Sequence, residues 1–352
     1  MNSSYCSKLE ELPYQFDHHV ILGEIRESRA RRILLQAPNG LKQYMPLLAK
    51  CIAEHAEVEV LLHGEGLYGA CYIGSFEYYK NLDIDLVIHL GHTPYPPGLG
   101  MTPESKPKIV YIPVYSKLRL SDNALDRLHS RLKELNAHRI GVITSVQHVL
   151  EARRIARLLG DLGYNVVLPR GFPPYFMDGQ VIGCDYRLAL SVQGDVDAYV
   201  FVGGGLFHAI GLYLSTRKPV IKADPYRDSV EDVMALGERT LRIRYKKMLD
   251  AMDARRWGVI VGEEPGQYRP WLINKIIDLL RKRGLEYMVI VGRKTDREFI
   301  ANNDSEWFQA FVITSCPRIP IDDLQDYHKP VLTPGEALMV LQGDLSRYRF
   351  PW

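Results

Sequence analysis

Three cysteines stand in predicted loops beside glycine or proline, where a bulky cofactor could be approached closely. Cys71 ends Tyr68-Gly69-Ala70-Cys71, Cys184 lies in 179–185 (GQVIGCD) and Cys316 in 314–318 (TSCPR). Three thiolates can bind an iron–sulfur cluster and leave one iron open for a substrate, whereas an electron-transfer cluster has four protein ligands. The alternative is that they are unrelated buried thiols, because no CxxC and no Cys/His pair at zinc-finger spacing is present.

The remaining two of the five cysteines are Cys6, in the N-terminal tail, and Cys51, on a predicted helix. A small buried hydrophobic role is the simplest reading of Cys51. An odd number of widely scattered cysteines excludes a dense disulfide scaffold and fits a reducing cytoplasm.

A glycine run follows one predicted strand in Val202-Gly203-Gly204-Gly205-Leu206-Phe207-His208. Because a helix follows it, its backbone N–H groups can bind an anion. The run can equally be a tight turn. His208 is either a ligand contact or a capping residue.

Two further segments carry polar side chains at predicted strand ends. Gln147 and His148, in Ser145-Val146-Gln147-His148, can contact a carboxylate or an adenine, and each can also be structural. His89 and His92 are better read as structural histidines, since zinc-ligand spacing is absent. Arg318, beside Cys316, can tune a cluster or hold a carboxylate.

Apolar runs alternate with helix-period segments, and continuous Val/Ile/Leu runs are typical of parallel strands covered on both faces. The predicted strands are 31–36, 57–62 and 85–90; 139–144, 165–168, 198–202 and 219–223; and 257–261, 286–291 and 310–314. The predicted helices are 41–55, 146–162, 206–215, 270–283 and 334–341.

The pattern restarts twice, near residues 139 and 257, which gives one small α/β unit each time. We therefore predict an α/β protein of three consecutive small domains with mainly parallel sheets, arranged around a shared central site. The predicted domains are 1–115 with Cys71, 116–226 with Cys184 and 227–352 with Cys316, joined through 106–118 and 224–257. In such sheets ligands bind beyond the carboxyl ends of the strands, where these three cysteines stand.

Composition excludes several classes of protein. Lys and Arg number 44 and Asp and Glu 42, a net charge of +2, which argues against binding nucleic acid by bulk charge. The basic stretch 239–247 (RTLRIRYKK) is most simply a solvated helix face. No apolar run is long enough to span a membrane, and the first residues lack a signal-peptide pattern.

Taken together, an ordered set of motifs over about residues 30–340 resembles the diphthamide synthases, the 2-(3-amino-3-carboxypropyl)histidine synthases. The motifs are Tyr68-Gly69-Ala70-Cys71, 85–92 (DLVIHLGH), 144–148 (TSVQH), 179–185 (GQVIGCD), 201–208 (FVGGGLFH), Lys218-Pro219-Val220, Asp224-Pro225-Tyr226 and 316–319 (CPRI).

The resemblance implies a non-classical radical S-adenosylmethionine enzyme, in which Cys71, Cys184 and Cys316 hold one 4Fe–4S cluster. Its open iron would contact the methionyl part of S-adenosylmethionine. Reductive cleavage would yield a 3-amino-3-carboxypropyl radical and methylthioadenosine, and the radical would add to C2 of a histidine imidazole in translation elongation factor 2. We assign the S-adenosylmethionine contacts, as a hypothesis, to Gln147, His148, Gly203, Gly204, Gly205, His208 and Arg318.

The compact size resembles the archaeal form, which implies a cytoplasmic homodimer that needs an electron donor and binds neither nucleic acid nor membrane. One departure is Tyr72, because the family often has an acidic residue just after the first cysteine region. Two alternatives stay open: a cluster-binding partner subunit that only carries electrons, and a metal-independent α/β transferase.

Overall fold

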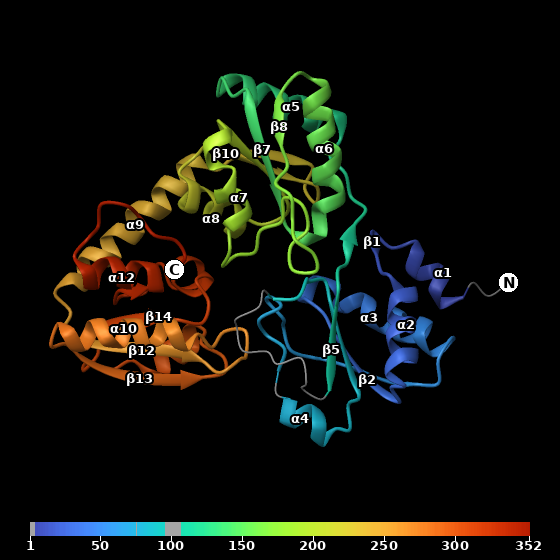
Figure 1. The fold of residues 1–352 in the computed structure, drawn as a ribbon, viewed down its shortest axis with the longest axis horizontal. Helices are drawn as coiled ribbons and strands as arrows, with labels where there is room; N and C mark the ends of the chain where they lie inside the picture. Colours follow the sequence, from blue (N-terminus) through green and yellow to red (C-terminus); the bar gives the residue numbers. More distant parts are fainter. Residues whose placement is uncertain (1–3, 75, 96–106) are drawn as a thin grey trace.

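The computed structural model describes residues 4–74, 76–95 and 107–352. Figure 1 shows three lobes that follow one another in the chain and meet near the middle of the molecule. Each lobe is built on one sheet, and a short two-stranded ladder links β1 (Tyr14–Gln15) to β6 (Tyr115–Ser116).

The first sheet has the order β3-β2-β4-β5, and all its strand pairs are parallel. Its strands are β2 (Arg32–Gln36), β3 (Glu59–Leu62), β4 (Leu86–Leu90) and β5 (Lys108–Ile112). Its helical segments are α1 (Tyr5–Glu10), α2 (His18–Ser28), η1 (Asn39–Tyr44), α3 (Met45–Ala53) and α4 (Phe76–Asn81). Asp17 caps α2 by accepting from the Val20 N–H, and a core of Ile21, Leu48 and Ile88 joins the helices to the sheet.

The second sheet has the order β11-β10-β9-β7-β8, and only the β10–β11 pair is antiparallel. Its strands are β7 (Arg139–Thr144), β8 (Asn165–Val167), β9 (Ala198–Val202), β10 (Val220–Asp224) and β11 (Ser229–Asp232). Its helical segments are α5 (Asp122–Glu134), η2 (Val146–His148), α6 (Val149–Asp161), α7 (Arg187–Ser191), η3 (Gln193–Asp195) and α8 (Phe207–Thr216). Strands β9 and β10 are buried along their whole length, as their apolar runs predict.

The third sheet has the order β13-β12-β14-β15 and is parallel throughout. Its strands are β12 (Arg256–Gly262), β13 (Glu286–Gly292), β14 (Ala310–Ile313) and β15 (Val331–Leu332). Its helical segments are α9 (Met234–Met252), α10 (Pro270–Lys282), α11 (Arg297–Asn303), η4 (Ile319–Asp323) and α12 (Pro334–Gln342). Helix α9 runs from the second lobe to the third and packs against α8 and α12 (Figure 1).

The predicted fold class is confirmed, because the sheets are mainly parallel and α/β in build. The predicted domain boundaries do not all fall between secondary-structure elements. The first linker, 106–118, contains strand β5, and Lys106 itself lies outside the described residues. Residue 226 comes before β11, which pairs with β10 and so extends the second sheet past that boundary.

The expectation that 239–247 is a solvated helix face is wrong for Arg244. Its side chain is completely buried on α9 and forms an ion pair of 2.6 Å with Glu336 of α12. It also donates to the backbone oxygens of Pro320 and Val331. A charge buried this deeply is tolerated because each guanidinium nitrogen has an acceptor.

The reading of Cys51 as a small buried hydrophobic residue is incomplete, because Cys51 is buried but is not a free thiol. The structure joins Cys6 and Cys51 in a disulfide that connects α1 to α3 across 45 residues. One such bond is still no dense scaffold, and Cys71, Cys184 and Cys316 are free.

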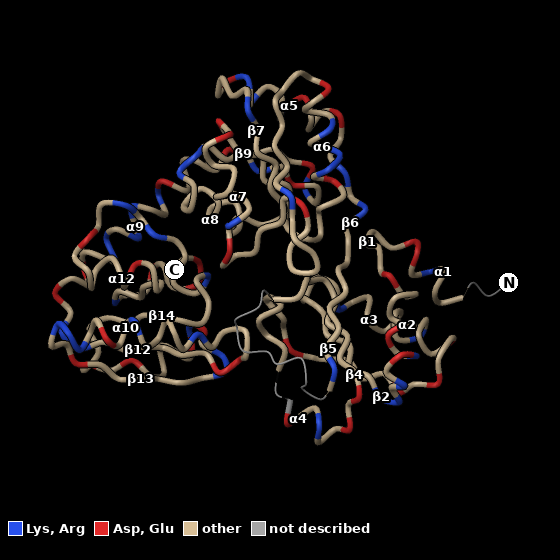
Figure 2. Tube along the Cα trace, in the orientation of Figure 1, with Lys and Arg blue, Asp and Glu red and all other residues tan. Residues whose placement is uncertain are grey.

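Lys and Arg alternate with Asp and Glu in all three lobes (Figure 2), as the balanced composition predicts. In the described part of the chain, no helix combines the length and apolar character needed to cross a membrane.

Candidate functional site

Cys71, Cys184 and Cys316 line one cavity of about 480 Å³, although their loops come from three different lobes. Cys71 follows β3, Cys184 precedes α7 and Cys316 follows β14. Parallel strands bring their carboxyl ends to one sheet edge, and the three edges face a common space. The predicted convergence of the cysteines is therefore what the structure shows.

The loop of Cys71 is in close contact with the third lobe. A Cβ on Gly266 would lie 2.4 Å from the Cys71 Cα, so only glycine fits there. The next residue, Gln267, points its Nε2 at the Cys71 sulfur from 3.8 Å. The first and third lobes are thus in direct contact at the wall of the cavity.

The loop of Cys184 is held by residues of the other two lobes. The Tyr95 hydroxyl lies 2.9 Å from the Cys184 sulfur. The indole N–H of Trp352 donates to the Cys184 backbone oxygen at 2.9 Å. Both contacts act across lobes, so the position of Cys184 depends on the assembled molecule.

Arg269 connects these loops. Its buried guanidinium donates to the backbone oxygens of Thr314 and Ser315, at 3.1 and 2.7 Å, just before Cys316. It also donates to the Tyr95 hydroxyl at 3.0 Å and lies 4.4 Å above the Trp352 ring. Five donors in a rigid fork suit this role, because one side chain can satisfy several acceptors in fixed directions.

Burial raises the pKa of Cys71 and of Cys316 to about 11 and that of Cys184 to about 12. Free thiols here are therefore protonated near neutral pH. A metal centre binds the thiolate form, so metal binding at these cysteines would release their protons. The affinity for the metal should therefore rise with pH.

The three sulfurs are spread around the cavity. Among the described residues, the groups whose ligand atoms all lie within 4.8 Å of one another do not include these three cysteines. A single ion with metal–sulfur bonds of about 2.3 Å would need the sulfurs closer together. A polynuclear cluster binds each cysteine through a separate iron, so the donor type and the spacing fit an iron–sulfur cluster better than a lone ion.

Four of the seven residues predicted to bind the second cofactor line the same cavity. They are Gln147, Gly205, His208 and Arg318. His148, Gly203 and Gly204 lie outside that lining: His148 packs edge-on against Tyr226 with ring centroids 4.8 Å apart. The Gly203 N–H is already used by the Ala223 oxygen at 3.0 Å.

The lining residues differ in their freedom to bind. Gly205 has a φ of +71° and open space where a Cβ would be, so its backbone can be approached. Burial, with Arg318 nearby, lowers the pKa of His208 to about 4, which keeps the ring neutral. Gln147 donates to the Gly91 oxygen at 2.6 Å, and its amide oxygen is left as an acceptor.

His89 is the structural histidine that the sequence suggests. It is completely buried, with Nδ1 3.0 Å from the Gln36 Oε1 and Nε2 2.9 Å from the His92 Nδ1. His92 also lines the cavity, and burial lowers its pKa to about 4.

Tyr95, Arg269 and Trp352 are the site residues that sequence reasoning missed. Each acts through a contact with a distant segment, and none stands in a recognisable motif. The sequence gives one weak signal for Arg269, which stands in the loop after β12, directly before the helix-starting Pro270.

A family model for diphthamide synthesis proteins matches residues 37–349. The 2-(3-amino-3-carboxypropyl)histidine synthase of Pyrococcus horikoshii is 35% identical over 330 residues, covering 94% of this chain and 91% of that protein. Subunit 1 of the corresponding synthase of Schizosaccharomyces pombe is 27% identical to this chain. The alignment covers 94% of this chain and 74% of that subunit.

The crystal structure of Dph2 from Pyrococcus horikoshii superposes on the chain with a TM-score of 0.81 at 32% identity. The match covers 96% of this chain and 93% of the other. A second structure of that protein, with the same TM-score, contains a 4Fe–4S cluster.

Proposed function

Since the chain belongs to the family of diphthamide synthesis proteins, we propose that it is a 2-(3-amino-3-carboxypropyl)histidine synthase. It transfers the 3-amino-3-carboxypropyl group of S-adenosylmethionine to C2 of a histidine in translation elongation factor 2. The observation that carries the proposal is the single cavity lined by Cys71, Cys184 and Cys316.

Those three thiols are the residues that hold the 4Fe–4S cluster. When bound and reduced, the cluster supplies the electron that cleaves the sulfur–carbon bond of a sulfonium at its open iron. The chain positions the ligands: Arg269 fixes the loop before Cys316, and Tyr95 and Trp352 fix Cys184.

The amino-acid part of S-adenosylmethionine needs an acceptor for its ammonium group and a cation for its carboxylate. Gln147 offers the amide oxygen, and Arg318 supplies the charge. Arg318 is held by Asp322 and Asp323 at 3.2 and 3.6 Å, so it is oriented before a ligand arrives. Gly205 and the neutral ring of His208 complete this side of the cavity. His148, Gly203 and Gly204 lie outside the cavity lining and are given no contact with the ligand in this arrangement.

Tyr72 stands where the family often has an acidic residue. Its hydroxyl donates to the Glu65 carboxylate at 2.8 Å, and the buried Glu264 lies in the same neighbourhood, paired with Arg293 at 2.7 Å. Tyr72 is thus tied to Glu65 and lies near the Glu264–Arg293 pair.

The reductant is proposed to approach from a second cavity of about 640 Å³, which also reaches Cys316. Its lining carries Arg293, Lys294, Arg297 and Arg318 together with Asp296, Glu298 and Asp323, so the charge there is mixed. The proposed route rests on the access that this cavity gives to Cys316. An enzyme that modifies a translation factor acts in the cytoplasm, where that substrate is made.

A homodimer is supported by the free edge of the third sheet. Within the described residues, strand β13 pairs with β12 alone, and Met288, Val289 and Val291 are exposed on it. A long apolar edge strand is a template for pairing with another chain. The second copy is the proposed occupant, because pairing β13 with its own equivalent gives a closed, self-complementary contact. Val289→Lys should convert a dimer to a monomer in light scattering, and a dimer that persists would place the interface elsewhere.

The activity is tested with anaerobically reconstituted protein, S-adenosylmethionine, a chemical reductant and elongation factor 2. The proposal predicts methylthioadenosine and a mass increase on the factor. Colourless, iron-free protein after reconstitution would refute the cluster. Cluster without either product would leave only the electron-carrier role.

The ligand assignment is tested separately. Cys71→Ala, Cys184→Ala and Cys316→Ala should each lose the absorption near about 400 nm that the cluster gives. Cys6→Ala is the matched control and should keep it. Retention of a normal cluster by any of the first three variants would remove that cysteine from the ligand set.

A further inference from the structure

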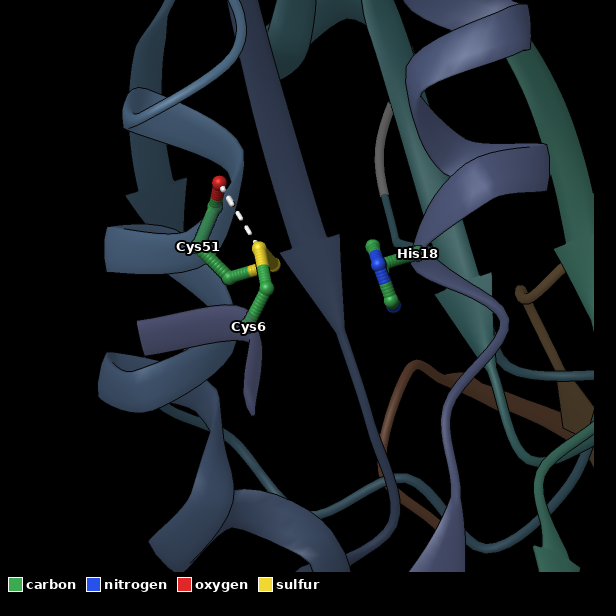
Figure 3. Close-up of side chains that lie close together, drawn as sticks. All are labelled: Cys6, His18 and Cys51. Atoms are coloured by element: carbon green, nitrogen blue, oxygen red, sulfur yellow. Dashed lines mark hydrogen bonds between the residues drawn. A yellow bond between two sulfur atoms is a disulfide. The ribbon is translucent and has the colours of Figure 1, made fainter. Parts of the chain in front are cut away.

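Three N-terminal helices, α1, α2 and α3, meet around a second group of sulfur and nitrogen ligands. Cys6 of α1, Cys51 of α3 and His18 at the start of α2 are all buried in the core of the first lobe. Figure 3 shows the disulfide and the His18 ring beside it. The two sulfurs and a ring nitrogen of His18 lie within 4.8 Å of one another.

A second histidine stands next to this group. His55 follows Cys51 by four residues, just past the end of α3, and its Nδ1 lies 3.1 Å from the Cys51 backbone oxygen. Its Nδ1 is 3.6 Å from the Cys6 sulfur. Ligand atoms around one tetrahedral zinc ion are separated by roughly 3.5–3.8 Å, so this pair is already at ligand spacing.

The ligand types are those of a structural zinc site. Two thiolates and two imidazoles give the Cys₂His₂ set, with Zn–S near about 2.3 Å and Zn–N near about 2.1 Å. The Cα atoms of Cys6 and Cys51 are 4.7 Å apart, so side-chain rotation alone can move their sulfurs onto one ion once they are no longer bonded. His55 is exposed and is grouped with Cys6 but not with Cys51 or His18, so its ring must turn toward these two residues to complete the set. A carboxylate oxygen of Glu54 lies within 4.8 Å of Cys6 and His55 and adds negative charge beside a cation.

We propose that Cys6, Cys51 and His18, with His55 as the fourth ligand, form a zinc site that exists only in the reduced protein and is exclusive with the disulfide. A dithiol reductant transfers two electrons to the disulfide, and with two protons the bond becomes two thiols while the reductant becomes its own disulfide. Zinc then binds both sulfurs and releases the two thiol protons. In either state the N-terminal helix α1 is fastened to α3, by a covalent bond or by the ion.

The site is separate from the catalytic cavity, because none of its four residues lines that cavity. This separation allows a crossed experiment on the full-length protein. Anaerobic protein is treated with a dithiol, loaded with iron, sulfide and Zn²⁺, and desalted, and both metals are counted by elemental analysis. Wild-type protein should hold about four irons and about one zinc per chain.

The variants should separate the two metals. Cys6→Ser and His18→Gln should lose zinc and keep iron, whereas Cys71→Ala should lose iron and keep zinc. His55→Ala should weaken zinc at least tenfold in competition with a chelator. Protein oxidised to the disulfide before loading should take up no zinc.

His18→Gln leaves the disulfide intact, so its oxidised form should melt like the wild type even if Cys6→Ser folds poorly. Cobalt substitution gives a second readout, a thiolate-to-metal absorption that disappears in Cys6→Ser. Reduced wild-type protein that retains no zinc and shows no cobalt–thiolate band would overturn the proposal. Zinc that persists in His18→Gln at wild-type affinity would overturn it as well.

Discussion

At the scale of single residues, a buried histidine behind the cofactor cavity makes stability depend on pH. His148 is almost completely buried, and its Nδ1 has no hydrogen-bond partner in the described part of the chain. Burial lowers the pKa of His148 to about 4, against the opposing pull of Asp224 and Glu151. The unfolded chain, with a histidine pKa near about 6.5, binds a proton more readily than the folded one.

Above pH 6.5 His148 is neutral in both states and does not reduce the free energy of unfolding. As the pH falls from 6.5 toward 4, the unfolded chain gains a proton on this residue and the free energy of unfolding decreases. Between pH 7 and 5 the wild type should lose on the order of 2 kcal/mol from this group alone. His148→Gln should lose correspondingly less over the same range, measured by urea unfolding at each pH. His138→Gln, at an exposed position, is the control. An identical acid loss in His148→Gln and wild type would contradict the assignment.

A second residue-scale prediction concerns the contact that sets the Cys71 loop. Gly266→Ala places a methyl group 2.4 Å from the Cys71 Cα, and a backbone atom cannot yield as a flexible side chain can. Overpacking of this kind costs about 1–3 kcal/mol. We expect lower iron occupancy and faster loss of the cluster in air.

Gly194→Ala is the matched control, because a Cβ there meets nothing within 4 Å. It should retain iron like the wild type. Equal iron retention in the two variants would mean that the Cys71 loop adjusts freely.

At the scale of elements, the strands were predicted closely because their burial leaves a local trace. Strands β7 and β9 coincide with the predicted ranges 139–144 and 198–202, which are mainly apolar and almost entirely buried. Strand β5 was missed although Ile109–Ile112 is an apolar run, because the run is short and Pro107 and Pro113 flank it, as in a linker. Propensity and periodicity report the environment of one segment only.

Contacts between distant segments leave no such trace. Arg244 looks like one of several surface charges on α9, and its partner Glu336 is 92 residues further along. Arg269 was missed in the same way, because its acceptors are backbone oxygens that any residue supplies. The three loop cysteines could be singled out because each stands beside glycine or proline in a predicted loop, and the structure places them around one cavity.

The Arg244–Glu336 pair is the main polar link between α9 and α12. Glu336 also accepts from the Tyr348 hydroxyl at 2.6 Å and from the Thr333 backbone N–H at 2.8 Å in the capping box of α12. Glu336→Ala leaves a buried guanidinium without its charge partner, so the free energy of unfolding should fall by about 3–5 kcal/mol.

The double variant Arg244→Met with Glu336→Leu removes both charges. It should cost less than the sum of the two single variants, because neither charge is left unpaired. Denaturant titration of the four proteins gives the comparison. Simple additivity would show that the pair contributes packing alone.

At the scale of the whole molecule, the three lobes share one polar junction. Tyr95 comes from the first lobe, Cys184 from the second and Arg269 with Trp352 from the third, and each contacts at least one of the others. The cavity is therefore complete only when all three lobes are docked. Loss of one member should loosen the lobes without unfolding any of them.

Trp352→Ala tests this coupling. It removes the hydrogen bond to the Cys184 oxygen, uncovers the guanidinium of Arg269 and trims partly buried packing against the core of the third lobe. The apolar cores of the first two lobes stay intact. The cluster should assemble but be lost several-fold faster in the presence of a chelator, since one ligand loop is less well held. Trp352→Phe should keep the ring contact and lose only the hydrogen bond, which gives an intermediate rate. Trp271→Ala, an exposed tryptophan on α10, is the control. Chelation of iron from Trp352→Ala at the wild-type rate would mean that the Cys184 loop is held in place by its own lobe.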